Sequence, residues 1–131
     1  MESTDSENRK PITDEEILDM TRELCARICL TGTYRSYYRC SRLLAQQEAL
    51  ASRVNEFRAR NLACCLEEQD EKKNEKTREL YQEYQDVLSE PVVMDFLAAE
   101  QEICRLLRRV QNSMAMNIPL NLSHMKEKEE L

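Results

Sequence analysis

The stretch that decides the fold is LSEPVVMDFLAAEQEICRLLRRVQNSM, residues 88–114. Its apolar side chains recur at alternating intervals of three and four residues, and the series passes through one acid: Val93, Phe96, Glu100, Ile103, Leu107, Val110 and Met114. This spacing is typical of one face of an α-helix that packs along other helices. It predicts a long helix from about Glu90 to Met116, with Ser89 as its cap and Pro91 in its first turn.

The composition favours helices throughout. The 131 residues include one glycine and three prolines, whereas sheets and barrels need clusters of turn-forming residues. A charged fraction of 34% with only 5% aromatic residues suits helices with solvated outer faces. We predict an all-α antiparallel bundle of about five helices. A single helical domain over 13–116 should lie between a disordered N-terminal tail, 1–12, and a mobile C-terminal tail, 117–131.

Two shorter helices are expected before the middle of the chain. The first should run from about Asp14 to Leu30, capped by Thr13 in a capping box, and should end at Gly32 as a C-terminal cap. Its apolar stripe is Ile17, Thr21, Leu24 and Ile28, flanked by Leu18 and Cys25. The second should run from about residue 34 to 46, with Thr33 as its cap.

A long helical hairpin should follow. A third helix begins near Glu48, with a stripe formed by Leu50, Val54, Phe57, Asn61 and Cys64, and could run past Glu67. Residues 67–79 carry no apolar side chain, so they should form a solvated tip with the turn near Asn74. A fourth helix returns through Leu80, Tyr84 and Val87. Such a thin bundle leaves apolar stripe uncovered, which predicts a homo-oligomer, a dimer or higher.

Glu100 and Asn61 each interrupt an apolar series. A buried polar residue that pairs with another one sets the alignment of helices at some cost in stability. The other interpretation is that Glu100 is a functional carboxylate. Catalysis would need a second titratable group in a pocket, and none is spaced near it, so we predict no catalytic residue and no enzyme.

The six cysteines favour packing over metal binding. They contain no CxxC pair, and the single histidine, His124, lies in the C-terminal tail. Free cysteine is also a common small core residue. We predict no metal and no cofactor on the single chain. Spacing alone leaves open a redox or metal site built from Cys25, Cys29, Cys64 or Cys104, or one assembled across subunits.

The charge distribution bears on partners and location. The net charge of −6 disfavours nucleic acid, although Arg35, Arg39 and Arg42 form a basic stripe beside tyrosines that could contact RNA. The first ten residues lack the apolar core of a signal peptide, and no stretch approaches the roughly 20 apolar residues of a membrane span. A cytoplasmic protein without membrane contact is expected.

Three segments resemble the YlbF/YmcA family of small bacterial helical proteins: TGTYRSYYRCSRLL (31–44), LASRVNEFRARN (50–61) and the long helix of residues 88–114. The resemblance spans roughly residues 14–117 and consists of helical positions, not of a catalytic signature. It implies a self-associating all-α fold with a regulatory role. Characterised members act with YaaT and the endoribonuclease RNase Y on messenger RNA processing, and through it on competence, sporulation and biofilm formation.

The resemblance also raises iron–sulfur chemistry, because some complexes of that system carry clusters and one branch has a cysteine-rich C-terminal tail. Here the tail, Asn117 to Leu131, has no cysteine, so a cluster is conceivable only in a multi-chain complex. The leading hypothesis is a non-enzymatic adaptor that oligomerises and binds YmcA/YlbF-like, YaaT-like and RNase Y proteins. The residues expected to pack or select the partner are Phe57, Asn61, Phe96, Glu100, Ile103, Leu107 and Val110.

Overall fold

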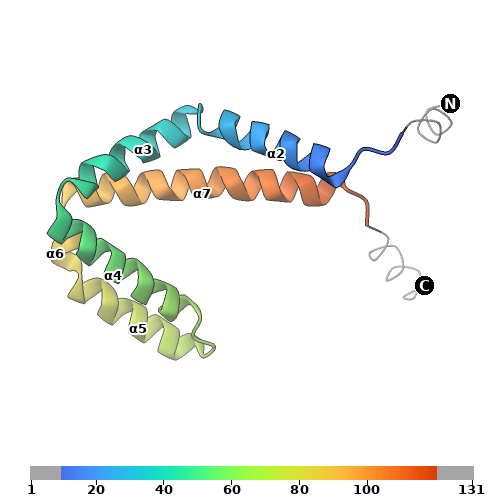
Figure 1. The fold of residues 1–131 in the computed structure, drawn as a ribbon. Helices are drawn as coiled ribbons and strands as arrows, with labels where there is room; N and C mark the ends of the chain where they lie inside the picture. Colours follow the sequence, from blue (N-terminus) through green and yellow to red (C-terminus); the bar gives the residue numbers. More distant parts are fainter. Residues whose placement is uncertain (1–9, 121–131) are drawn as a thin grey trace, which may run out of the picture. The chain divides into compact units, whose positions relative to one another are not determined.

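The computed structural model describes residues 10–120, and its regular segments are all helices (Figure 1). Within that range there is no strand, and the prediction of an all-α fold is confirmed. Parts of both predicted tails, residues 1–9 and 121–131, lie outside the described residues. The helices are α2 (Asp14–Ile28), α3 (Gly32–Ala45), α4 (Glu48–Cys65), α5 (Asp70–Glu83), α6 (Gln85–Leu88) and α7 (Pro91–Asn117).

The chain divides into two compact units, residues 1–35 and 36–131. Helix α2 makes up most of the described part of the first unit. It begins as predicted, because the Thr13 hydroxyl oxygen accepts a hydrogen bond from the Glu16 backbone N–H at 3.2 Å. Three acids in its first turn complement the helix dipole. No residue of α2 is buried.

The predicted role of Gly32 is wrong. Helix α2 ends at Ile28 with Cys29 as its cap, and Gly32 is the first residue of α3 without a positive φ. Thr31, not Thr33, caps α3: its hydroxyl oxygen accepts from the Tyr34 N–H at 3.1 Å. The same hydroxyl donates to the Ile28 carbonyl at 2.7 Å. One side chain therefore satisfies backbone groups at the end of one helix and the start of the next, and no left-handed glycine is needed.

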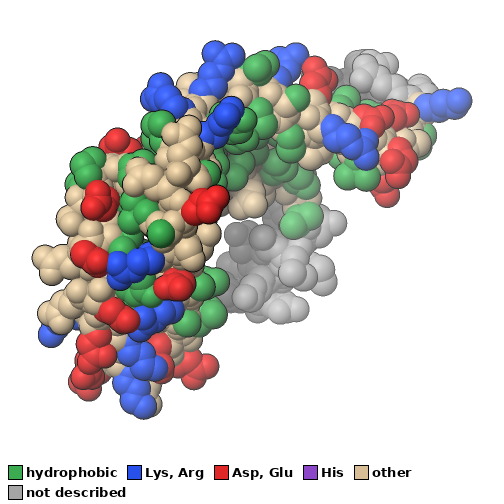
Figure 2. All heavy atoms as spheres, turned by 60° about the vertical axis from the view of Figure 1, so that its left-hand side comes forward, with side chains coloured by type: hydrophobic (Ala, Val, Ile, Leu, Met, Phe, Trp, Pro, Cys, Tyr) green, Lys and Arg blue, Asp and Glu red, His purple; other side chains and the backbone are tan. Residues whose placement is uncertain are grey.

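The predicted position of the hairpin turn is also wrong. Helix α4 ends at Cys65, the turn lies at residues 66–69, and α5 begins at Asp70 instead of near Leu80. A fully polar segment can be helical when it is solvated and its charges suit the helix ends, as Asp70 and Glu71 do. Lys76 reaches back across the turn to Glu67 at 2.7 Å. Figure 2 shows charges of both signs interleaved over the hairpin.

The core of the second unit lies where α4, α5, α6 and the start of α7 meet. Val54, Val87 and Val93 are its most deeply buried large side chains, at 1%, 2% and 0% exposure. The chain bends at Tyr84, between α5 and α6, and Pro91 occupies the first turn of α7 after Glu90, not Ser89, as cap. The buried cluster comprises Leu44, Val54, Phe57, Cys64, Leu80, Tyr84, Val87, Val93 and Phe96.

An ion pair ties α4 to α6 and predicts a response to acid. Arg53 donates to an Asp86 carboxylate oxygen at 2.5 Å, and this hydrogen bond lowers the pKa of Asp86. Because the pKa is lower in the folded state, the stabilisation is present above the ordinary aspartate value, about 3.9, and is lost as pH falls through the lowered pKa. In the wild type, the urea concentration at the midpoint of unfolding should therefore fall as the pH is lowered from about 5 to 2. Asp86→Asn should make this fall slightly smaller, because it removes the pair; the effect is small since the pair is solvated.

The matched control for that titration is Asp95→Asn, which removes an exposed carboxyl group from α7. It should leave the contribution of the Arg53–Asp86 pair in place. Identical acid limbs for the wild type and Asp86→Asn would contradict the assignment.

Candidate functional site

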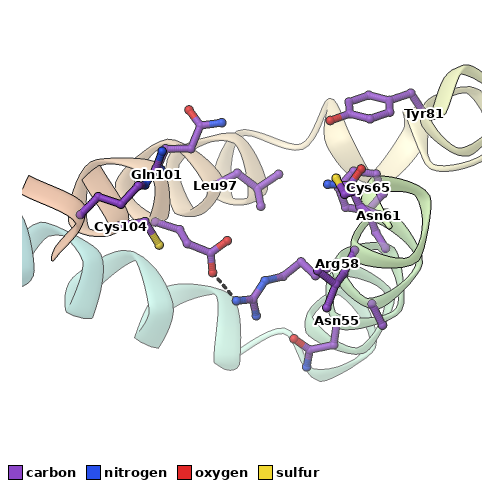
Figure 3. A pocket seen from close by; sticks show the side chains of 13 residues that line it. Asn55, Arg58, Asn61, Cys65, Tyr81, Leu97, Gln101 and Cys104 are labelled. Carbon is purple, nitrogen blue, oxygen red and sulfur yellow. Dashed lines mark ion pairs between the residues drawn. The ribbon is translucent and has the colours of Figure 1, made fainter. Parts of the chain in front are cut away.

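A cleft of about 660 Å³ opens between α4, the end of α5 and the middle of α7 (Figure 3). All of its walls belong to the second unit. The wall from α4 and the wall from α7 face each other, and Tyr81 lies at the α5 end. The lining residues are Asn55, Phe57, Arg58, Ala59, Asn61, Leu62, Cys65, Tyr81, Leu97, Glu100, Gln101, Cys104 and Arg108.

An ion pair between Arg58 and Glu100 spans the cleft from α4 to α7 (Figure 3). The Glu100 side chain is 21% exposed and that of Arg58 is 43% exposed, so the pair is partly shielded from water. The Arg58 guanidinium also lies 5.6 Å from the centre of the Phe96 ring, a cation–π distance. Arg58 therefore links the polar cleft to the core beneath it.

Aromatic rings hold the α4 wall against α5. The Phe57 ring meets Tyr81 edge-on at 5.3 Å between centroids and lies 5.6 Å from the Tyr84 ring. The Tyr84 hydroxyl donates to Glu56 at 3.4 Å, and the guanidinium groups of Arg53 and Arg60 lie 5.4 and 5.5 Å from the centre of the Tyr84 ring. This packing gives the cleft a preorganised wall.

The residues predicted to pack or to select a partner fall into three environments. Phe57, Asn61 and Glu100 come together in the cleft, although neither polar side chain is fully buried. Phe96 and Ile103 are buried, at 5% and 7% exposure. Leu107 is 43% exposed, and Val110 is half-buried.

Sequence reasoning missed Arg58 as the partner of Glu100. The pair joins two helices far apart in the chain, so periodicity within either helix gives no sign of it. The available signal was the group of three arginines in residues 53–60, beside the apolar stripe of α4. A cation one position from the apolar stripe of α4 could have been tested as a partner for the single acid in the stripe of α7.

The basic stripe on α3 lies at the surface. Arg35, Arg39 and Arg42 are exposed, and the Arg42 guanidinium is 5.8 Å from the centre of the Tyr38 ring. Tyr37, on the neighbouring face, packs against Phe96 with ring centroids 5.8 Å apart. Tyr37, one of the tyrosines beside the basic stripe that could contact RNA, therefore packs on a core residue.

The cysteines do not form a metal-binding group on this chain. Among residues 10–120, no three His, Cys, Asp or Glu side chains are grouped to hold a metal ion. Cys64 is buried, Cys40 is half-buried, and the exposed thiols are those of Cys25, Cys29, Cys65 and Cys104. The described residues thus do not fit an iron–sulfur cluster. No helix in the same part of the chain is long and apolar enough to cross a membrane.

Comparison with known protein families shows the family of this chain. The family model described as "Control of competence regulator ComK, YlbF/YmcA" matches residues 17–119, a range that contains every residue lining the cleft. No curated protein and no solved structure matches the chain.

Proposed function

The chain belongs to the YlbF/YmcA family, and from this premise we propose that it is a cytoplasmic, non-enzymatic adaptor that self-associates and binds protein partners of a regulatory pathway. The family description concerns the control of a competence regulator, which supports a role in regulation. Following the resemblance, the proposed partners are YmcA/YlbF-like, YaaT-like and RNase Y proteins. The consequence would be altered processing of messenger RNA, with effects on competence, sporulation and biofilm formation.

The observation that carries the proposal is the composition of the α4–α5–α7 cleft. It combines exposed apolar surface, with Leu62 at 62% and Tyr81 at 48% exposure, with a charged pair and three side-chain amides. Protein interfaces have such a mixture: apolar contacts exclude water, and placed polar groups select the partner.

Self-association has separate support in the exposed apolar residues of the helices. Ile17, Leu24, Leu107 and Met114 are between 38% and 50% exposed, although each lies on the stripe of its helix. Water contact with such stripes costs about 25 cal/mol per Å² of apolar surface. A second copy would remove part of this surface from water.

The experiment compares Glu100→Gln with the wild-type full-length chain in binding to purified RNase Y, YaaT and YmcA homologues of the same organism. Loss of the charge that faces Arg58 should weaken partner binding about tenfold or more, since hydrogen bonds to charged groups contribute roughly 1.5–3 kcal/mol. The free energy of unfolding should change by no more than about 1 kcal/mol, because the pair is partly solvated.

The control is Glu102→Gln, which removes an equally charged residue on α7 that pairs with Arg105 outside the cleft. This variant should bind like the wild type. Equal weakening by both substitutions would show a general charge effect and would contradict selection by the cleft. Absence of binding to all three homologues by the wild type would overturn the proposed partners.

A further inference from the structure

The cleft between α4, α5 and α7 carries more positive than negative charge. Its charged lining residues are Arg58, Arg108 and Glu100, two cations and one anion, which give a net charge of +1. Glu100 pairs with Arg58. Within residues 36–120, the described part of the second unit, no carboxylate pairs with Arg108. The charge of this guanidinium is therefore left for an acidic ligand to compensate.

The other arginine of the cleft already binds a carboxylate. Arg58 is held by Glu100 and is still 43% exposed. A guanidinium has five N–H donors, and the two oxygens of one carboxylate engage only some of them. Arg58 therefore keeps donors for a second acceptor, and a carboxylate from outside the chain suits both arginines.

The walls of the cleft are two helix faces. The lining of α4 runs from Asn55 to Cys65 and that of α7 from Leu97 to Arg108. At 1.5 Å per residue, each wall is about 15 Å long, roughly three helical turns. Along both walls the lining residues recur at steps of three and four: Asn55, Arg58, Leu62 and Cys65 on α4, and Leu97, Gln101, Cys104 and Arg108 on α7.

The secondary structure of the walls favours a helix as the occupant. The backbone N–H and C=O groups of α4 and α7 are used within those helices, so an extended peptide would find no main-chain partners along them. A helix needs only side-chain contacts. The cleft offers apolar ones, because Leu62 is 62% and Tyr81 is 48% exposed and Leu97 is half-buried.

We propose that the cleft binds one amphipathic, acidic helix of a partner protein. The apolar face of that helix contacts Leu62, Leu97 and Tyr81, and an aspartate or glutamate beside this face binds Arg108. The inference rests on the proposed adaptor function and specifies which kind of partner segment the cleft recognises. Apolar contacts supply affinity, and the guanidinium of Arg108 selects an acidic helix over a basic one.

The probe is a synthetic peptide of about 18 residues, long enough to form a helix, with leucines at steps of three and four and glutamates beside them. Fluorescence anisotropy measures its binding to the full-length chain at about 0.15 M salt, where long-range charge effects are screened. One comparison peptide carries lysine in place of glutamate, and another has the same composition in scrambled order. The glutamate peptide should bind about tenfold more tightly than either.

Arg108→Glu should weaken binding of the glutamate peptide about tenfold or more and should strengthen binding of the lysine peptide. The matched control is Arg109→Glu, which makes the same charge change at the next position of α7, exposed and outside the cleft. It should leave the affinity within about threefold, as expected for a screened charge. Leu62→Ala should weaken binding severalfold. Unchanged circular dichroism and urea midpoints would show that these variants are folded.

The outcomes separate this inference from the proposal on which it rests. Equal binding of the glutamate and lysine peptides, tight binding of the scrambled peptide, or equal losses from Arg108→Glu and Arg109→Glu would overturn it. A single-stranded RNA that displaces the peptide at a lower concentration than unlabelled glutamate peptide does would assign the cleft to phosphate and also overturn it. If the chain binds its homologous protein partners but not the glutamate peptide, the acidic helix is wrong and the adaptor function stands. A chain that binds neither overturns both.

Discussion

Replacement of Phe57 by alanine is expected to lower the free energy of unfolding by about 3–5 kcal/mol. The Phe57 ring is 4% exposed and contacts Tyr81 and Tyr84, so its removal opens a cavity between α4 and α5. The helix α4 itself should remain, because alanine is a good helix former. Urea unfolding followed by far-ultraviolet circular dichroism measures the difference.

Leu62→Ala is the matched control for Phe57→Ala. Leu62 lies on the same helix but is 62% exposed, so its truncation should change the free energy of unfolding by no more than about 0.5 kcal/mol. If Phe57→Ala were no more destabilising than Leu62→Ala, the packing of α4 against α5 would be incorrect.

Leu107→Asp is expected to weaken self-association by roughly 100-fold or more while leaving the chain helical. Leu107 is 43% exposed in the single chain, so a carboxylate there can stay hydrated in the monomer. In an assembly that covers this face, the same carboxylate would be buried without a partner, at a cost of about 3–5 kcal/mol. Sedimentation equilibrium over a concentration series measures the change.

Met116→Asp is the control for Leu107→Asp. Met116 lies on the same helix, outside its apolar series, and is 86% exposed. The added charge should leave the association constant within about twofold, as expected for a substitution at an exposed position. A Leu107→Asp variant that sediments as an unchanged, fully helical oligomer would contradict the role of this face.

The ends of the helices could be predicted from the sequence where only one nearby residue was suited to the position. Thr13 followed by three acids marked the start of α2, and Pro91 marked the first turn of α7. Where two nearby residues could both cap a helix, the prediction selected the wrong one. Thr31 and Thr33 are both competent caps, and only the three-dimensional structure shows that the hydroxyl of Thr31 reaches both Ile28 and Tyr34.

The predicted position of the turn in the polar hairpin was wrong for a related reason. The absence of apolar residues in 67–79 predicts a solvated tip with its turn near Asn74, but a solvated segment can be helical without contributing to a core. The turn instead follows the last buried residue of α4, Cys64, and returns the chain so that Leu80 and Tyr84 can pack against that helix. Packing of the flanking residues, not the composition of the tip, set the length of the hairpin.

By itself, the sequence determined that this protein is helical, where most of its helices lie and which face of each is apolar, because these properties depend on residues a few positions apart. Tertiary structure alone decided that Arg58 faces Glu100, that Phe57, Asn61 and Glu100 share a cleft, and that Leu107 remains at the surface while Ile103 is buried. These outcomes depend on contacts between helices distant in the chain. Periodicity assigns a residue to a face, whereas only the packed structure shows which neighbour covers that face.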